Sequence, residues 1–197
     1  MTKIKFDSEL RSEFNELIKE IALSDEAREM KKYIQHTDVS TYKHCMNVAL
    51  VSFYIAKKYK VKNVDLKTLV IGGFLHDYFL YDWHMQGDKL HGYHHPHIAA
   101  LNARRDFNVD ENVMKVIKSH MWPLTITFVP TSKEAAIVCL ADKIVSTKDS
   151  LSKRHSKMKA MEGEIEERKN VNRLAKEEKK HQKKSRRRAR KAETGNN

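Results

Sequence analysis

Residues 65–78 read DLKTLVIGGFLHDY, and this stretch decides the fold. Its apolar side chains recur on almost every side of a helix, which indicates a helix buried at the centre of the protein. The apolar run IGGFL leads directly to His76 and Asp77. An unpaired carboxylate is costly to bury, so Asp77 needs a partner there. The stretch therefore predicts a central helix that ends at a polar site.

Helical patterns flank this stretch on both sides. Their apolar residues recur three and four positions apart, and Ser24, Ser40 and Ser132 stand where N-caps are expected. The one run that resembles a strand is TITFVP at 125–130, and it is short. We therefore expect an all-α fold. The expected helices cover residues 8–23, 25–36, 41–59, 65–78, 96–107, 111–120 and 132–148.

Residues 80–94 interrupt the helical pattern with two glycines and no apolar period. A loop of this length is often functional. Asp82 and His84 are candidate substrate-binding residues within it, in a lid that supplies an acid to the leaving group. The alternative is a surface loop with incidental histidines.

Whole-chain composition excludes several classes of protein. The 197 residues allow one domain of ordinary size, and no stretch reaches the roughly 18 apolar residues of a membrane span. The N-terminus MTKIKFDSEL lacks the apolar run of a secretory signal. Cys45 and Cys139 are too few for a disulfide framework and are interpreted as free thiols. We expect a cytoplasmic protein.

Positive charge is concentrated in the last quarter of the chain. The net charge is +12, and residues 148–197 hold 18 Lys/Arg against 8 Asp/Glu. We therefore expect a helical domain over residues 1–150 and a basic tail over residues 151–197 that passes from helix to disorder. The run KKHQKKSRRRARK at 179–191 resembles a nucleic-acid-binding arm, so RNA or another polyanion is an expected partner. A solubilising extension is the alternative.

Two further polar residues lie in apolar helical patterns. His44 stands beside an apolar stripe in residues 41–59, and Asp142 interrupts the run AIVCLADKIV. Together with His76 and Asp77 they offer imidazole and carboxylate ligands without cysteine, a set that suits Mn, Fe, Co, Zn or Mg. A divalent cation would offset the cost of burying them.

The order of these residues resembles the HD superfamily of metal-dependent phosphohydrolases. A lone His is followed about 30 residues later by His-Asp and, about 65 residues after that, by Asp in an apolar helix. HHPHIAA at 94–100 and VIKSHMW at 116–122 resemble segments of two-metal members. The resemblance covers residues 36–150. It implies His95 and His120 as further ligands, with His94 and His97 as alternatives in register.

The resemblance also implies a bundle of helices with a central metal site. One or two divalent metals would bind per chain, and in the two-metal arrangement Asp77 would bridge them. The implied ligands are His44, His76, Asp77 and Asp142 for one metal, and Asp77, His95 and His120 for the other.

The implied reaction is hydrolysis of a phosphate ester or anhydride of a small, nucleotide-like substrate by a metal-activated hydroxide. Asp77 and His76 are the expected catalytic residues, with Lys143 on a substrate phosphate. Arg104 and Arg105 are candidate substrate contacts as well. Two alternatives stay open, a phosphodiesterase acting on RNA and a non-catalytic RNA- or ribosome-associated protein. In both, the basic tail would be the anchor.

Overall fold

The computed structural model of the 197-residue chain describes residues 8–36, 39–83 and 90–151. The chain divides into two compact units, Met1–Ser150 and Leu151–Asn197. The features that follow lie in the first unit. The expected basic tail falls almost entirely outside the described residues, so its helical-to-disordered character stays a prediction.

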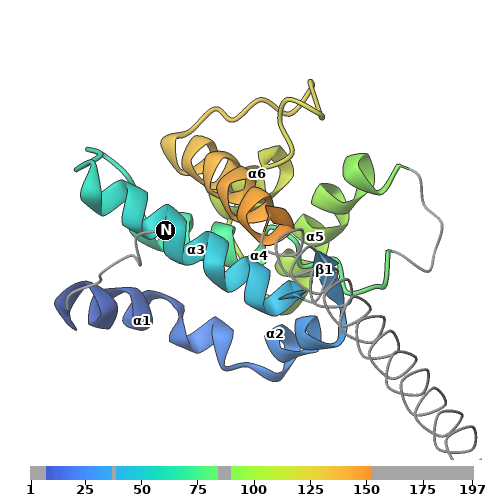
Figure 1. Cartoon of the computed structure of the whole chain (residues 1–197), viewed down its shortest axis with the longest axis horizontal. Coiled ribbons are helices and arrows are strands. Elements are labelled where there is room, and N and C mark those ends of the chain that lie inside the picture. Colours follow the sequence, from blue (N-terminus) through green and yellow to red (C-terminus); the bar gives the residue numbers. More distant parts are fainter. Residues whose placement is uncertain (1–7, 37–38, 84–89, 152–197) are drawn as a thin grey trace, which may run out of the picture. The chain divides into compact units, whose positions relative to one another are not determined.

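The first unit is built from helices and one small hairpin (Figure 1). The all-α class predicted from the sequence is confirmed. The helices are α1 (Ser8–Ala22), α2 (Asp25–Glu29), η1 (Met30–Lys32), α3 (Thr41–Lys58), α4 (Leu66–Leu75), α5 (His91–Phe107) and α6 (Glu111–Ser119). Residues 133–151 are helical as well. Strands β1 (Ile34–His36) and β2 (Val39–Ser40) pair antiparallel.

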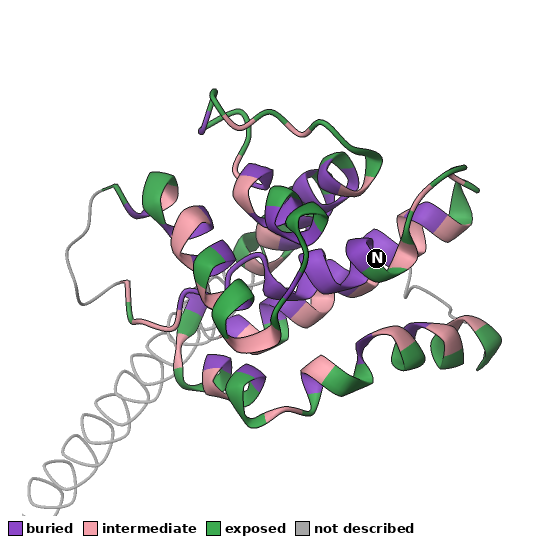
Figure 2. Cartoon of the chain, turned by 180° about the vertical axis from the view of Figure 1, so that it is seen from behind, coloured by how far each residue is buried: buried purple, intermediate pink, exposed green. Residues whose placement is uncertain are grey.

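Helix α4 lies at the centre, as its apolar sequence predicts. Every residue from Thr68 to Leu75 is buried. The helix packs against α3, α6 and α1, and the buried surfaces of these helices face it (Figure 2). Gly72 and Gly73 allow this close approach. A Cβ atom on Gly72 would lie 2.6 Å from Cγ1 of Val116 on α6, and one on Gly73 would lie 3.1 Å from the Cα atom of Ala49 on α3.

Polar side chains fix where the helices begin. Ser24, Ser40 and Ser132 accept hydrogen bonds from backbone N–H groups three residues later, as expected for N-caps. Asp65 caps α4, because its carboxylate accepts hydrogen bonds from the N–H of Lys67 at 3.0 Å and from the hydroxyl of Thr68 at 2.6 Å. The start of the central helix is therefore held by local hydrogen bonds.

The segment after α2 differs from the prediction. One helix was expected over residues 25–36, but the helical residues end at Lys32 and Tyr33 turns to extended backbone with φ −108° and ψ 140°. The N–H of Thr41 bonds the carbonyl of Tyr33 at 2.9 Å, and β1 pairs with β2. Pairing with a segment beyond residue 36 thus overrides the helical pattern, and the expectation of no strand is wrong at this point.

Two other expectations are corrected. Helix α5 begins at His91 rather than near residue 96, so Pro96 lies inside it and the preceding loop is shorter than expected. The early start places His91 and His95 one turn apart on a buried face. Residues 125–130, the short run that resembles a strand, form bends, turns and irregular backbone, so no strand is formed there.

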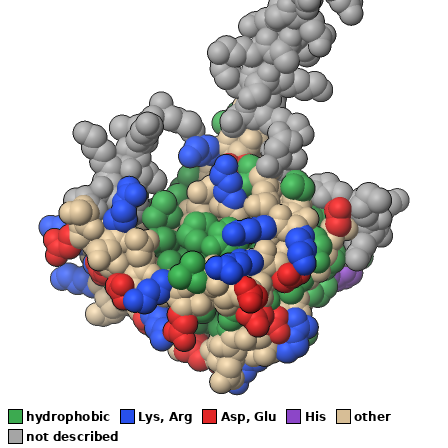
Figure 3. All heavy atoms as spheres, turned by 90° about the horizontal axis from the view of Figure 1, so that it is seen from below, with side chains coloured by type: hydrophobic (Ala, Val, Ile, Leu, Met, Phe, Trp, Pro, Cys, Tyr) green, Lys and Arg blue, Asp and Glu red, His purple; other side chains and the backbone are tan. Residues whose placement is uncertain are grey.

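Both signs of charge are spread over the surface of this unit. In Figure 3, lysine, arginine, aspartate and glutamate side chains surround a group of hydrophobic side chains on one face. Among the helices that the structure describes, none combines the length and apolar character needed to cross a membrane.

Candidate metal centre

Five helices bring six polar side chains together beside the end of α4. His76 is the C-cap of α4 and Asp77 follows it, while His120 is the C-cap of α6. The five residues other than Asp142 are at most 3% exposed, and Asp142 is 9% exposed. The six are His44 on α3, His76 and Asp77 after α4, His95 on α5, His120 after α6, and Asp142 in the helix of residues 133–151.

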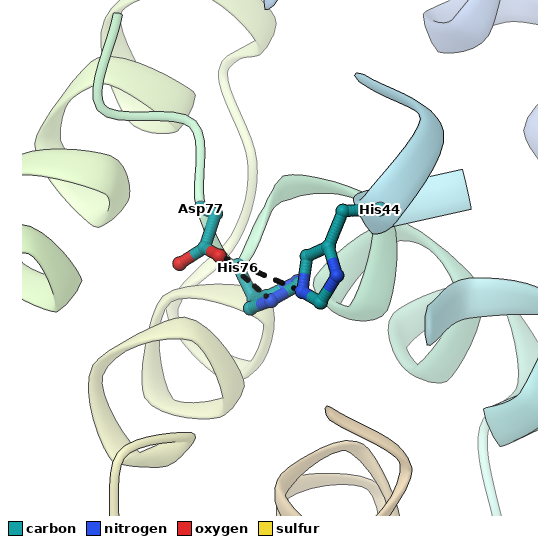
Figure 4. A group of neighbouring side chains, drawn as sticks. All are labelled: His44, His76 and Asp77. Carbon is teal, nitrogen blue, oxygen red and sulfur yellow. Dashed lines mark ion pairs between the residues drawn. The ribbon is translucent and has the colours of Figure 1, made fainter. Parts of the chain in front are cut away.

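The carboxylate of Asp77 faces two separate pairs of imidazoles. Its Oδ2 atom lies 3.2 Å from Nε2 of His76 and 3.8 Å from Nε2 of His44, the group drawn in Figure 4. Its Oδ1 atom lies 3.1 Å from Nε2 of His95 and 3.4 Å from Nε2 of His120. One carboxylate thus offers one oxygen to each of two neighbouring positions, which is the arrangement of a bridging ligand.

Asp142 completes the first of these positions. Its Oδ1 atom lies 3.2 Å from Nε2 of His44 and 3.6 Å from Nε2 of His76. The hydroxyl of Ser146, one turn further along the helix, donates to the same oxygen at 3.0 Å. Among the described residues, three overlapping groups have ligand atoms close enough together to hold a metal ion. The groups are His44, His76 and Asp77; His76, His120 and Asp142; and Asp77, His95 and His120.

Hydrogen bonds to the backbone orient three of the imidazoles. Nδ1 of His76 donates to the carbonyl of Gly73 at 2.9 Å, Nδ1 of His95 to that of His91 at 2.8 Å, and Nδ1 of His120 to that of Ile117 at 2.7 Å. A neutral imidazole that donates from Nδ1 presents a lone pair at Nε2. All three Nε2 atoms are therefore directed at Asp77 as acceptors. This tautomer is the one that metal-binding histidines require.

The acceptors need a cation between them. Nε2 of His95 and Nε2 of His120 lie 2.9 Å apart, and both face Oδ1 of Asp77. Among the described residues, neither Nε2 of His76 nor Oδ1 of Asp77 has a hydrogen-bond partner. Buried lone pairs in such contact repel one another unless a proton or a metal ion joins them. The nitrogen and oxygen donors suit a divalent transition metal or Mg²⁺, so the residues fit the implied metals.

The electrostatics favour an ionised carboxylate pair. Burial opposes ionisation of Asp77, but the surrounding imidazoles outweigh it and hold the pKa of Asp77 well below its usual range. Burial likewise opposes ionisation of Asp142, and the neighbouring imidazoles of His44 and His76 hold its pKa well below the usual range. Burial lowers the pKa of His120, which favours the neutral imidazole that a metal needs.

A cavity of about 650 Å³ opens onto this cluster. Asp77, His95, His120 and Asp142 are among the residues that line it. Elsewhere its wall is formed by the apolar residues Met121, Pro123 and Leu124 and by the polar residues Lys143, Ser146 and Thr147. A small molecule in this cavity could therefore contact both the cluster and apolar side chains.

The structure distinguishes among the neighbouring histidines of α5. His95 is 3% exposed and belongs to the cluster. His94 is exposed, and the ring of His97 packs against Phe128 with centroids 4.5 Å apart. The alternatives in register are thereby excluded as members of the cluster.

The predicted substrate contacts have different outcomes. Lys143 lines the cavity, where its Nζ donates to the carbonyls of His120 and Cys139 at 3.3 Å each. Arg104 bonds the carbonyl of Val109 and Arg105 pairs with Asp106, both near the opposite end of α5 from His95. These arginines do not line the cavity, because about three helical turns separate them from its wall. The structure gives no support to their expected contact with substrate.

The loop residues do not extend the site within the described part of the chain. Asp82 is exposed and does not line the cavity. His84 lies outside the described residues, so its role as a lid residue stays a prediction.

The structure adds two polar residues that the sequence did not single out. Nε2 of Gln35 donates to Oδ2 of Asp77 at 2.5 Å, and Oδ2 of Asp149 lies 3.5 Å from Nδ1 of His44. Asp149 follows Asp142 by two helical turns, so helical spacing was a usable signal for it. For Gln35 no such signal exists, because it lies in the segment whose helical pattern is misleading.

Comparisons with known proteins agree with this geometry. The model of the HD domain matches residues 41–147, which is more than half of the chain. The matched range includes all six residues of the cluster. No curated protein matches the chain, and no solved structure matches it.

Proposed function

Since the chain belongs to the HD-domain family, whose members are typically metal-dependent hydrolases, we propose that it is a two-metal phosphohydrolase. Its substrate would be a phosphate ester or anhydride of a nucleotide-like compound. The observation that carries the proposal is the carboxylate of Asp77, with one oxygen toward His44 and His76 and the other toward His95 and His120.

The donor set explains why phosphate chemistry is the best match. Two divalent cations, when bound, lower the pKa of water and stabilise negative charge on a phosphoryl group. Asp77 and Asp142 supply two ionised carboxylates, and the histidines supply neutral lone pairs oriented by the backbone. The buried surroundings exclude bulk water, which strengthens the attraction between these groups and a cationic centre.

The cavity supports a small organic phosphate as substrate. Its volume of about 650 Å³ lies in the usual range of small-molecule sites. Met121, Pro123 and Leu124 offer an apolar wall to a base or similar group, while Lys143 at the same cavity offers a cation to a phosphate. A nucleotide combines both parts in one molecule.

The test is a screen of metal-reconstituted protein against nucleoside mono- and diphosphates, dinucleoside polyphosphates, cyclic dinucleotides and short RNAs. We expect hydrolysis of a phosphoester or phosphoanhydride bond in at least one of these compounds, in a reaction that depends on Mn²⁺ or another divalent ion and is lost in Asp77→Asn. Asp25→Asn, at an exposed aspartate of α2 outside the cavity, is the matched control and should keep full activity. A folded, metal-loaded protein that hydrolyses no member of the panel would overturn the proposal.

The charge of the tail favours a second candidate, a phosphodiesterase that acts on RNA. Residues 148–197 hold 18 Lys/Arg against 8 Asp/Glu, and such a segment attracts a phosphate backbone. Replacing Arg186, Arg187 and Arg188 by glutamine should then raise KM for RNA and leave hydrolysis of small phosphoesters unchanged. RNA binding without any cleavage would instead support the non-catalytic alternative.

A further inference from the structure

Strand β1 places an amide side chain directly on the bridging carboxylate. Gln35 is 5% exposed, and its Nε2 donates a hydrogen bond of 2.5 Å to Oδ2 of Asp77. This is the oxygen that faces His44 and His76. In this orientation the amide N–H₂ donates to the carboxylate oxygen, whereas a reversed amide would set two acceptor oxygens against each other.

The local backbone is shaped to deliver this side chain. Ile34 pairs with Ser40 and His36 pairs with Val39, so Gln35 is the extra residue of a bulge in β1. Bulges re-aim a side chain and are common beside active sites. Ile34, the residue before it, is 40% exposed, while Gln35 points into the protein. The small hairpin in an otherwise helical unit therefore has a specific result, the placement of one amide at Asp77.

The other end of the amide is a buried acceptor in a residue that lines the cavity. Gln35 lines the cavity together with Asp77, His95 and His120. Its Oε1 atom is buried and has no hydrogen-bond partner among the described residues. An unsatisfied buried carbonyl costs about 1–3 kcal/mol, so such an atom calls for a donor from a bound molecule.

We propose that Gln35 is a positioning residue for both the metal site and the attacking water. Its N–H group holds the Asp77 carboxylate in the rotamer that turns one oxygen toward each pair of histidines. Its carbonyl accepts a hydrogen bond from the water that attacks phosphorus. Gln35 takes up no proton, because an amide oxygen is a hydrogen-bond acceptor and not a base at neutral pH. The second half of this inference rests on the proposed function, whereas the first does not.

The experiment compares the Gln35→Leu variant with the wild-type protein, both as full-length chains. Leucine is close in size but has neither the donor nor the acceptor. We expect Mn²⁺ affinity, measured by calorimetry, to fall about 10-fold or more, the usual effect of removing a group that orients a metal ligand. At saturating Mn²⁺ we expect kcat to fall as well, while KM for the phosphate substrate changes less than about twofold, because the amide oxygen acts on the water rather than on the substrate.

Two further variants separate this role from a structural one. Ile34→Ala changes the neighbouring, exposed side chain of the same strand and should leave Mn²⁺ affinity and kcat unaltered. Gln35→Met is unbranched and flexible, so it fills the same space if leucine disturbs the fold, and it should show the same losses. Circular dichroism and the Tm of each variant establish that the fold is retained.

Specific results would overturn the inference. If both Gln35 variants keep the Mn²⁺ affinity and the kcat of the wild type, both proposed roles of Gln35 are wrong. A rise in KM with unchanged kcat would overturn the second half, because the amide oxygen would then contact substrate and not water. If the wild-type protein binds Mn²⁺ but cleaves no phosphate compound, the proposed function fails, and the Mn²⁺ affinity of Gln35→Leu still decides the first half.

Discussion

Asp149 lies behind the imidazole of His44, with its Oδ2 atom 3.5 Å from Nδ1 of the ring. On the other side of the ring, Nε2 lies 3.2 Å from Oδ1 of Asp142. Two carboxylates from the same helix thus lie next to the two ring nitrogens of His44. A carboxylate at Nδ1 holds the proton there and leaves the Nε2 lone pair for a metal.

Replacement of Asp149 should therefore weaken metal binding without removing a ligand. In Asp149→Ala, the affinity of the site for Mn²⁺ is expected to fall about 10- to 100-fold, because the tautomer of His44 is no longer fixed. Calorimetric titration measures the change. Lys148→Ala, a substitution of an exposed neighbour, is the control. Equal affinities in the two variants would show that Asp149 does not orient His44.

The neighbouring histidines of α5 allow a matched test of the second metal position. His95→Ala removes a nitrogen that faces Oδ1 of Asp77, whereas His94→Ala changes an exposed side chain one residue away. Elemental analysis of metal-reconstituted protein should give about two metal ions per chain for His94→Ala and about one for His95→Ala. Two ions in both variants would contradict the bridging arrangement.

The cap of α4 gives a prediction for stability and its pH dependence. Asp65→Ala should lower the free energy of unfolding by about 1 kcal/mol at pH 7, because α4 loses its N-cap. The hydrogen bond from Thr68 is the largest cause that lowers the pKa of Asp65 in the folded protein. The charged cap therefore contributes fully above the unfolded pKa of about 3.9, and its contribution is lost as the pH falls through the folded pKa.

Urea unfolding at a series of pH values measures this effect. The difference between wild type and Asp65→Ala should be constant from pH 5 to neutral pH, and it should shrink at more acidic pH. Asp65→Asn is the control, since asparagine caps a helix without titrating. A difference that persists unchanged through the acidic range would show that ionisation of Asp65 does not contribute.

The contact between α4 and α6 predicts the effect of one methyl group. Gly72→Ala places a Cβ atom 2.6 Å from Cγ1 of Val116, so the two helices must move apart. We expect the free energy of unfolding to fall by about 1–3 kcal/mol. The double variant Gly72→Ala with Val116→Ala should recover part of the loss, because the second change removes the clashing group. Additive losses in a double-mutant cycle would mean that this contact does not limit the packing.

The sequence predicted the centre of the molecule well because burial leaves a periodic signal. The apolar run of residues 65–78 indicated that α4 is central, and Asp142 stood out as a charged residue in an apolar helix. Both inferences depend on local pattern. The family resemblance supplied His95 and His120, whose own surroundings in the sequence carry no such signal.

What the sequence did not predict depends on contacts between distant segments. Residues 34–36 lie where a helical pattern continues, yet they form β1 by pairing with residues 39–40, and this pairing brings Gln35 to Asp77. Helix α5 begins earlier than expected because His91 and His95 are buried by tertiary packing. A pattern in a single sequence reports the periodicity of one segment and carries no information about its packing against distant segments.

The separation of His44 and Asp142 by 98 positions also bears on the order in which the protein acquires its site. Synthesis proceeds from the N-terminus, so a nascent chain that has emerged as far as His120 already contains five of the six clustered residues but lacks Asp142. The helix that supplies Asp142, Ser146 and Asp149 is the last element of the first unit to appear. Completion of the site is therefore a late event of biogenesis, and a ribosome-bound fragment ending before residue 142 has no means of assembling it.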